Sequence, residues 1–377
     1  MKFRDLGAQY QALKPEIDAG IQAVIDSTAF ILGAPVDELE EELAAYVGRK
    51  HCVACASGTD ALQLGLMLKG IGPGDAVFTS DFTYFASAGT TSILGATPVL
   101  VDIDLATFNM DPTALEAQIL RVLDEKELTP RAIVPVDLFG QPADYDRILP
   151  IAEKYGLFVL EDAAQGFGGS IRGQMACSFG ELSATSFFPA KPLGCYGDGG
   201  AIFTDSDEEA ARLKSLRAQG KSPVDKYDNR EIGVNSRLDT IQAAILLPKL
   251  KAFREHEVDD VNRVATLYTE RLKDAFVTPE VLSGYVSSWA QYTILLPDRG
   301  TRDMTQAQLK EQGIPTMIYY PRGLHQQEAY RWMGLSDDDY KNTVEATDRC
   351  LSLPMHPYMA EKDVDEVCEA LLKCVSK

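Results

Sequence analysis

The 377-residue sequence predicts an α/β protein with a large, mixed or parallel sheet domain and a smaller C-terminal α+β domain. Between residues 51 and 205, short β-rich runs alternate with amphipathic runs, which is typical of a sheet covered by helices on both faces. After residue 239 a long helical stretch and shorter mixed elements follow. We therefore expect a large domain over 1–249 and a small domain over 250–377, with an N-terminal helix that could pack on the small domain.

Seven strands and four helices are expected in the alternating region. Each strand is a run of apolar or β-branched residues bounded by turn-forming or polar residues. The expected strands span 51–57, 76–80, 98–103, 132–138, 157–163, 184–189 and 200–205. The expected helices span 59–70, 85–96, 112–123 and 143–156.

The C-terminal third predicts fewer and longer elements. Residues 240–275 read as one helix, kinked at Pro248, because proline removes a helical hydrogen bond. Strands are expected over 290–297 and 315–321, and a closing helix over 361–376. This combination of helices and short strands predicts a small α+β domain.

Composition excludes several classes of protein. With 36 basic and 56 acidic residues, the net charge of −20 would repel nucleic acid and anionic membranes. The first residues mix charged and apolar side chains, so we expect neither a secretory signal nor a membrane anchor. Seven cysteines, few and odd in number, fit free thiols in a reducing compartment. A cytoplasmic enzyme is the first expectation.

The first candidate binding site is the segment 57–62, which follows the first expected strand and opens a helix. Free amide groups at a helix start, with small residues that allow close approach, can hold an anion such as phosphate. The alternative is that Ser57 merely caps the helix.

The second candidate is the pair Glu161 and Asp162, at the carboxyl end of an apolar strand. Open α/β sheets bind ligands at this edge, and a buried carboxylate needs a cation or a hydrogen-bond donor. The alternative is a carboxylate that only caps the following turn over 163–165.

The third candidate is Lys191, which stands between Pro189 and Pro192 and before a glycine-rich segment. The prolines fix the backbone and the glycines permit tight turns, so the amine is aimed by rigid main chain. Lysines that form Schiff bases need such a setting, although a solvated loop lysine is the alternative. A phosphate site, a buried acid and an oriented amine together fit pyridoxal 5'-phosphate (PLP).

The sequence resembles the PLP-dependent nucleotide-sugar aminotransferases of the DegT type, within the fold-type-I, aspartate aminotransferase-like enzymes. The resemblance runs over nearly the whole chain. It is carried by FILGAPVDELEEELAAYVG (30–48), ASGTDAL (56–62), GPGDAV (72–77), EDAAQGFG (161–168), SFFPAKPLGCYGDGGA (186–201), GVNSRLDTIQAAIL (233–246) and SLPMHPY (352–358).

The resemblance implies a role for each residue near the cofactor ring. Lys191 matches the lysine that forms the Schiff base with PLP and shuttles the substrate proton, and Asp162 matches the partner of the pyridine nitrogen. Gln165 matches a residue beside the ring oxygen. Tyr84 is the expected aromatic side chain stacked on the ring, with Phe82 as the other candidate.

The resemblance also implies how the phosphate is held. Gly58 and Thr59 match the phosphate-binding backbone, and Ser186 matches a hydroxyl that binds the same group. Asn235 matches a phosphate ligand donated by the neighbouring subunit. A homodimer with shared active sites is therefore expected.

The implied reaction moves an amino group from an amino acid, with L-glutamate as the expected donor, to a keto group of a nucleotide-linked sugar. The closest expected acceptor is a UDP-3-keto-N-acetylglucosaminuronate-type sugar, used in bacterial surface-polysaccharide or lipopolysaccharide precursor synthesis. Arg237 is the expected contact to an acidic substrate, with a purely structural arginine as the alternative. Tyr320 and His325 are further substrate-side candidates.

Three other functions remain as alternatives. They are a 4-keto nucleotide-sugar aminotransferase, a PLP-dependent sugar dehydratase and a non-catalytic PLP-binding regulator. Related dehydratases carry histidine in place of the lysine, so Lys191 favours transamination.

Some other conspicuous residues are interpreted as structural. Cys52 and Cys55 are expected to be buried thiols, because they fall on opposite faces of a strand and no second Cys or His pair follows at a spacing that would bind zinc. His356 is expected to be packed, and the acidic run 37–43 to be a solvated helix face.

Overall fold

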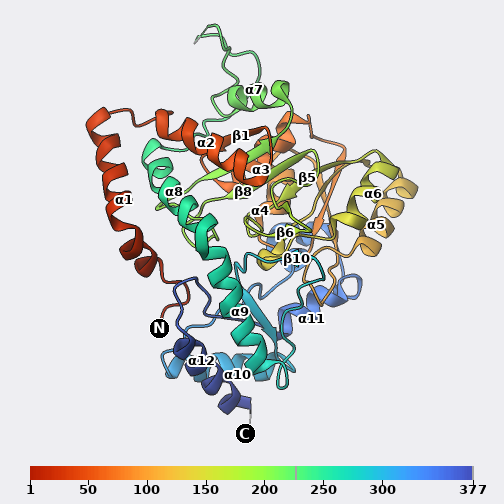
Figure 1. Ribbon diagram of the computed structural model, residues 1–377. Coiled ribbons are helices and arrows are strands. Elements are labelled where there is room, and N and C mark those ends of the chain that lie inside the picture. Colours follow the sequence, from red (N-terminus) through yellow and green to blue (C-terminus); the bar gives the residue numbers. More distant parts are fainter. Residues whose placement is uncertain (226, 376–377) are drawn as a thin grey trace.

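The computed structural model describes residues 1–225 and 227–375, and its centre is a seven-stranded mixed sheet (Figure 1). Each of the seven predicted strands is present, with ends shifted by a few residues. In spatial order they are β1 (His51–Cys55), β9 (Gly200–Thr204), β8 (Leu182–Ser186), β5 (Phe158–Asp162), β4 (Thr129–Val134), β2 (Asp75–Ser80) and β3 (Thr97–Val101). Strand β9 runs antiparallel to β1 and β8, whereas the pairs from β8 to β3 are parallel.

Helices cover both faces of the sheet, as the alternating pattern predicts. The predicted helices correspond to α3 (Gly58–Leu68), α4 (Ala86–Ile93), α5 (Pro112–Glu125) and α6 (Tyr145–Tyr155). Helices α2 (Ala34–Val47) and α7 (Asp207–Leu216) also pack on the sheet, whereas α1 (Leu6–Ser27) lies further out. The pleat of β1 illustrates the arrangement. Cys52 packs with α2 and with α8 (Thr240–Ala252), and Cys55 packs with α3 on the other face. Both thiols are free and buried, as predicted.

The predicted helix over 240–275 is an interrupted one. It consists of α8 (Thr240–Ala252), a π-helical turn (Phe253–Glu257) and α9 (Val258–Leu272). Pro248 lies inside α8 one turn before the irregular segment, and it leaves the carbonyl of Ala244 without a helical donor. That carbonyl faces Gly20 of α1, where a Cβ atom would lie only 3.1 Å away, so α1 packs closely on α8.

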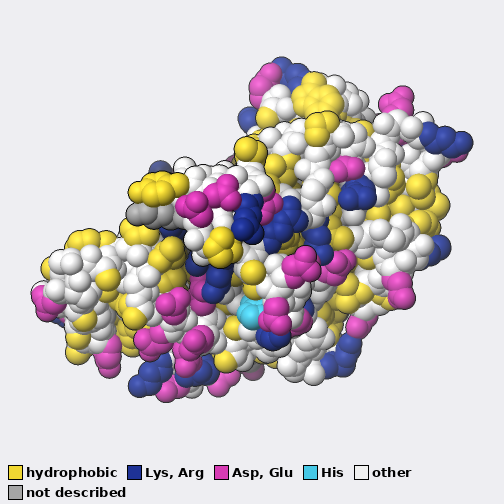
Figure 2. Space-filling view, turned by 90° about the horizontal axis from the view of Figure 1, so that it is seen from above, with side chains coloured by type: hydrophobic (Ala, Val, Ile, Leu, Met, Phe, Trp, Pro, Cys, Tyr) yellow, Lys and Arg dark blue, Asp and Glu magenta, His cyan; other side chains and the backbone are white. Residues whose placement is uncertain are grey.

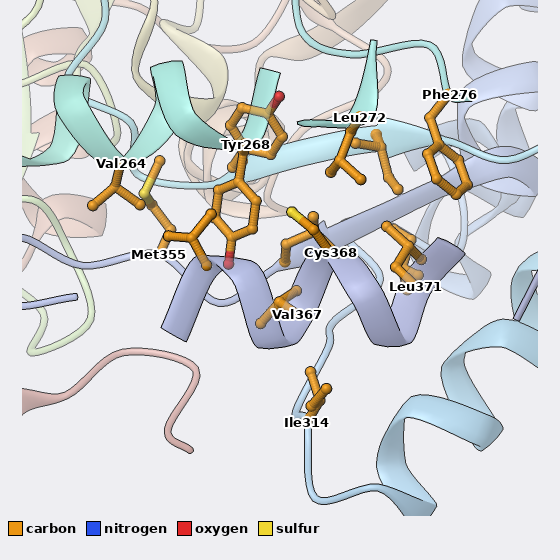
Figure 3. Close-up of a cluster of buried hydrophobic side chains, with 14 of the residues drawn as sticks. Val264, Tyr268, Leu272, Phe276, Ile314, Met355, Val367, Cys368 and Leu371 are labelled. Carbon is orange, nitrogen blue, oxygen red and sulfur yellow. The ribbon is translucent and has the colours of Figure 1, made fainter. Parts of the chain in front are cut away.

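The C-terminal region has a core of its own. Figure 3 shows α9 and α12 (Glu361–Val375) packed through Val264, Tyr268, Val367, Cys368 and Leu371. This buried cluster draws all of its members from Val261 to Cys374. The remaining elements are α10 (Arg299–Glu311), α11 (Lys341–Arg349) and the antiparallel pair β11 (Tyr292–Leu295) and β12 (Cys350–Leu353). The predicted boundary at 249/250 falls inside α8, and its position stays a prediction.

Two elements expected in the C-terminal region have different outcomes. Residues 315–321 were expected as a strand, and this prediction is wrong, because only Met317 forms a single bridge, to Ser352. Pro315 and Pro321 lack amide hydrogens, and Tyr320 instead packs on Phe82, with ring centroids 5.8 Å apart. The predicted closing helix is present as α12, whereas residue 376 lies outside the described residues.

The N-terminal segment lies against the C-terminal region. The Phe3 carbonyl accepts a hydrogen bond from Met355 N (3.0 Å).

The surface carries charges of both signs. On the face seen in Figure 2, basic and acidic side chains are intermixed. Within the acidic run 37–43, Glu40 is buried and paired with Arg217, so this helix face is only partly solvated. No helix in the described part of the chain is long and apolar enough to cross a membrane.

Candidate active site

The start of α3 forms a tight backbone cradle at the edge of the sheet. Ser57 caps the helix by accepting a hydrogen bond from Asp60 N (3.1 Å), which leaves the amides of Gly58 and Thr59 without helical acceptors. A Cβ atom on Gly58 would lie 2.5 Å from Cβ of Ser186, and one on Gly200 would lie 2.4 Å from the Ser57 carbonyl oxygen. The capping and anion-binding interpretations of this segment are therefore compatible. The cradle can hold a phosphate through backbone amides and the Ser186 hydroxyl.

Asp162 ends β5 and is 4% exposed. Its carboxylate accepts hydrogen bonds from Ser87 Oγ (2.8 Å) and Ala164 N (3.2 Å). Burial raises the pKa of Asp162, and these two neutral donors oppose the shift. Among the described residues no cation lies within ion-pair distance of this carboxylate. A buried carboxylate of this kind fits a protonated ring nitrogen.

The neighbouring Glu161 has a different environment. It lies on the opposite face of β5 and accepts hydrogen bonds from Cys177 N (2.7 Å), Phe179 N (2.8 Å) and Ser183 Oγ (2.7 Å). Two of these donors belong to the segment after β7 (Gln174–Met175) and the third to β8, so both oxygens of Glu161 are engaged within the fold. Of the two adjacent acids, Asp162 is the one available to a ligand.

Lys191 lies in a turn that the main chain fixes on both sides. Its amide donates to Phe188 O (2.8 Å), and Phe187 in turn bonds to Gly199 (2.7 Å) and Cys195 (2.8 Å) through backbone groups. Burial lowers the pKa of the Lys191 amine to about 8; Asp162 opposes this shift and Arg4 adds to it. A substantial fraction of the amine is thus neutral, and therefore nucleophilic, near physiological pH.

Two aromatic candidates at the end of β2 occupy different environments. Phe82 is fully buried against the rings of Phe108, Phe139 and Tyr320. Tyr84 is 59% exposed, and its ring is free to lie over a bound heterocycle. The structure therefore favours Tyr84 over Phe82 as the stacking residue.

Gln165 links the large sheet to the segment around residue 320. Its Oε1 accepts a hydrogen bond from Phe139 N (2.9 Å), and its Nε2 donates to the Tyr320 hydroxyl (3.1 Å). Burial raises the pKa of Tyr320, so its hydroxyl stays protonated and remains able to donate a hydrogen bond to a ligand. The structure thus brings Gln165 and Tyr320 together, although 155 residues separate them.

Asn235 and Arg237 flank the buried Ser236, which ties their segment to the cradle. Ser236 Oγ accepts a hydrogen bond from Ala56 N (3.0 Å), and its amide donates to Arg217 O (2.8 Å). Asn235 is exposed and Arg237 is partly exposed. Within residues 1–225 and 227–375, neither side chain has a hydrogen-bond or ion-pair partner. Both are therefore available to a ligand or to a second copy of the chain.

His325 has no free nitrogen. Its Nδ1 bonds to Asp81 Oδ2 (2.6 Å), its Nε2 bonds to Asp337 Oδ1 (2.9 Å), and its ring stacks on Tyr340 at 4.5 Å. The side chain is 1% exposed. This arrangement favours an anchoring role for His325 over contact with substrate.

Ser87, which no motif in the sequence marks, donates the hydrogen bond that orients Asp162. It lies in the first turn of α4 and also contacts Thr83 Oγ1 (3.3 Å). A serine among small residues carries no special signal, and its partner is 75 positions away. Only the packing of α4 against the sheet reveals the contact.

Residues 11–372 match the DegT/DnrJ/EryC1/StrS aminotransferase family. The chain belongs to this family. It is 47% identical, over 98% of its length and 99% of the relative, to the UDP-2-acetamido-2-deoxy-3-oxo-D-glucuronate aminotransferase of Pseudomonas aeruginosa. It is 43% identical to a pleiotropic regulatory protein of Geobacillus stearothermophilus, over 97% of this chain and 96% of that one. A solved DegT/DnrJ/EryC1/StrS aminotransferase from Brucella abortus shares 47% identity over the full length of both chains, with a TM-score of 0.96.

These matches confirm the expected family, the fold-type-I architecture and the enzyme class, a PLP-dependent aminotransferase. The residues present fit the cofactor that this family uses. The glycine-lined cradle at α3 suits its phosphate, the buried Asp162 suits its ring nitrogen, and the Lys191 amine suits its aldehyde carbon. The roles of the individual residues stay predictions.

Proposed function

We propose that the enzyme transfers an amino group from L-glutamate to the keto carbon of a nucleotide-linked sugar of the UDP-2-acetamido-2-deoxy-3-oxo-D-glucuronate type. The observation that carries the proposal is the placement of Lys191 near the buried Asp162, on one edge of the sheet beside an anion cradle. The 47% identity to an enzyme named for that sugar supports the choice of acceptor.

The residues at this edge of the sheet have catalytic roles that follow from their chemistry. Bound PLP supplies an electron-accepting ring, which lowers the cost of removing a proton from the carbon that carries the nitrogen. The Asp162 carboxylate, aligned by Ser87, stabilises positive charge on the ring nitrogen. The Lys191 Nζ accepts the proton from one carbon and returns it to another, which its lowered pKa of about 8 allows at neutral pH.

The substrate side of the site has two candidate binding groups, Arg237 and Tyr320. The Arg237 guanidinium can bind a carboxylate or a phosphate through two parallel hydrogen bonds. The Tyr320 hydroxyl, positioned by Gln165, can donate a hydrogen bond to a sugar oxygen. We keep His325 as an anchor for the wall of the site, because both of its nitrogens are engaged.

We also propose that the active enzyme is a homodimer in which Asn235 completes the phosphate site of the partner. The exposure of Asn235 and its lack of a partner among the described residues support this role. All seven cysteines are buried, and buried thiols suit a reducing compartment such as the cytoplasm, where we place the enzyme.

The direct test is an assay of the PLP-loaded protein with L-glutamate and a panel of 3-keto and 4-keto nucleotide sugars. We expect 2-oxoglutarate to form with the UDP-linked 3-keto uronic acid, and NMR to place the new amine on C3. Formation of 2-oxoglutarate only with 4-keto sugars would favour the alternative transaminase. No amino transfer from a PLP-loaded protein would favour a regulatory role.

A further inference from the structure

Arg4, near the N-terminus, lies at the active site although it is far from the other site residues in the sequence. Its Nη2 donates a hydrogen bond to the carbonyl oxygen of Pro192 (3.2 Å), the residue directly after Lys191. The guanidinium is therefore fixed beside the backbone turn that aims the Lys191 amine. Its charge also reaches that amine, since Arg4 contributes to the lowering of the Lys191 pKa.

The backbone around Arg4 is held on both sides. Before it, the Phe3 carbonyl accepts a hydrogen bond from Met355 N (3.0 Å), and the Phe3 ring meets the edge of Tyr319 at 6.2 Å. After it, Asp5 caps α1 through Ala8 N (2.9 Å). A side chain between two such anchors has little freedom of direction. Arg4 is thereby placed between the Lys191 turn and the Tyr319–Tyr320 segment that bears the substrate-side hydroxyl.

The positive charge of Arg4 has no counter-charge in contact with it. Among the described residues its only hydrogen-bond acceptor is the neutral Pro192 carbonyl, and no carboxylate lies within ion-pair distance. The acid that acts on it electrostatically is Glu257, whose oxygens are already bound by Gln9 Nε2 (2.9 and 3.0 Å) and the Tyr358 hydroxyl (2.7 Å). Burial lowers the pKa of Arg4 to about 10, so the guanidinium stays charged at neutral pH.

A partly buried guanidinium with one neutral acceptor is poorly compensated, because desolvation of a charge is costly without a partner. Four of its five N–H groups remain for a planar, bidentate anion. The cradle at α3 already provides for a phosphate. The anion that must lie near the reacting carbon, and hence near Lys191, is a substrate carboxylate.

We propose that Arg4 binds a carboxylate of the substrate and so contributes to the selection of acidic substrates. The proposal rests on the proposed function, in which both reactants bring such a group. The amino acid has its carboxylate one bond from the reacting carbon, and the uronic acid has one on the same sugar ring. Arg4 is a substrate-binding residue in this account, and Lys191 still moves the proton.

The experiment measures the two half-reactions separately in the PLP-loaded protein, by the absorbance change of the cofactor at increasing substrate concentration. The substrates are L-glutamate, the UDP-linked 3-amino uronic acid, and the same amino sugar with a neutral hydroxymethyl group at C6. The variants are Arg4→Gln and Arg4→Lys. The matched control is Lys2→Gln, which removes a positive charge two residues away from a side chain that is 63% exposed.

We expect Arg4→Gln to raise the half-saturating concentration of a carboxylate-bearing substrate by about tenfold or more, the usual cost of losing hydrogen bonds to a charged group. The neutral amino sugar should be unaffected, Arg4→Lys should be intermediate, and Lys2→Gln should behave as the wild type. An effect on glutamate alone identifies the amino acid as the ligand, and an effect on the uronic sugar alone identifies the sugar. Equal losses for all three substrates, or no loss for any, would overturn the proposal.

A second measurement does not depend on turnover. In cofactor-free protein, Arg4→Gln should raise the pH at which Lys191 begins to react with added PLP, because a neighbouring positive charge is removed. An unchanged midpoint would contradict the placement of Arg4 beside the amine. If the wild type reacts with glutamate but with no UDP sugar, the proposed sugar substrate fails, and the glutamate comparison still decides the role of Arg4.

Discussion

Asp162 and Lys191 each depend on neighbours that tune their charge. Asp162 is held by the neutral donors Ser87 Oγ and Ala164 N, so its negative charge remains available to a ligand. The sequence singles out both residues because each stands in a local pattern, an apolar strand end and a proline-bracketed turn. Ser87 could not, because nothing local marks its contact across 75 positions. His325 was expected near substrate, and only the structure reveals that Asp81 and Asp337 occupy it.

The substitution Asp162→Asn tests the acid. An amide cannot stabilise a positive ring nitrogen as a carboxylate does, so kcat should fall by about 100-fold or more while the protein stays folded. Steady-state kinetics with circular dichroism as a folding check measure this. Asp146→Asn, in an exposed ion pair with Arg172, is the control and should retain wild-type kcat. A wild-type kcat in Asp162→Asn would show that the Asp162 carboxylate is not needed for catalysis.

The pH dependence of cofactor uptake tests the lysine. Only the neutral amine attacks the PLP aldehyde, and burial lowers the pKa of Lys191 to about 8. The second-order rate constant for PLP binding to cofactor-free protein should therefore rise by about tenfold per pH unit below the midpoint and level off above it. Stopped-flow absorbance measures this profile. A midpoint at the ordinary lysine value of 10.5 would mean that the amine is solvated.

At the scale of elements, the site is assembled where strand ends meet helix starts. Strand β1 leads into α3, and β5 and β8 end in Asp162 and Ser186 at the same edge. The alternation of apolar and amphipathic runs predicts these elements well, because period and length are local properties. The strand predicted over 315–321 fails for one local and one non-local reason. Its prolines remove ladder donors, and Tyr320 is drawn to Gln165 and Phe82 instead.

The tight contact between α3 and β8 can be tested at Gly58. A Cβ atom there would lie 2.5 Å from Ser186, so Gly58→Val should displace the start of α3 and spoil the phosphate cradle. We expect the dissociation constant for PLP to rise by about tenfold or more, equivalent to ~1.4 kcal/mol. Fluorescence titration of cofactor-free protein measures it. The control is Gly72→Ala, because a Cβ atom at Gly72 has no neighbouring atom within 4 Å. Equal PLP affinity in both variants would contradict binding of the PLP phosphate by the cradle.

At the scale of the whole molecule, the site draws on distant parts of one chain. Arg4 contacts Pro192 in the Lys191 turn, and its neighbour Phe3 contacts Tyr319. Tyr320 in turn contacts Gln165, which follows β5. The change of pattern after residue 239 predicts two domains, and this division stays a prediction. The structure shows a buried cluster confined to Val261–Cys374, and α8 runs through the predicted boundary. The position of the N-terminal segment depends on contacts with Met355 and Tyr319, which no local pattern indicates.

The proposed homodimer with shared active sites leads to a prediction about mixtures of two variants. Lys191→Ala and Asn235→Ala should each be nearly inactive, the first for lack of the amine and the second for lack of a phosphate ligand. If Asn235 serves the partner subunit, a mixed dimer contains one site with neither defect, so refolding the two variants together should restore part of the activity. Activity of the mixture is compared with that of each variant refolded alone. A mixture no more active than its parts would place Asn235 outside a shared site.

The central claim is that the side-chain nitrogen of Lys191 carries the cofactor. Treating the PLP-loaded protein with borohydride makes the bond between cofactor and amine permanent, and mass spectrometry of a proteolytic digest then locates it. We predict a single modified peptide that contains Lys191, and none in the Lys191→Ala variant. Finding the cofactor on another lysine, or on none, would contradict the account.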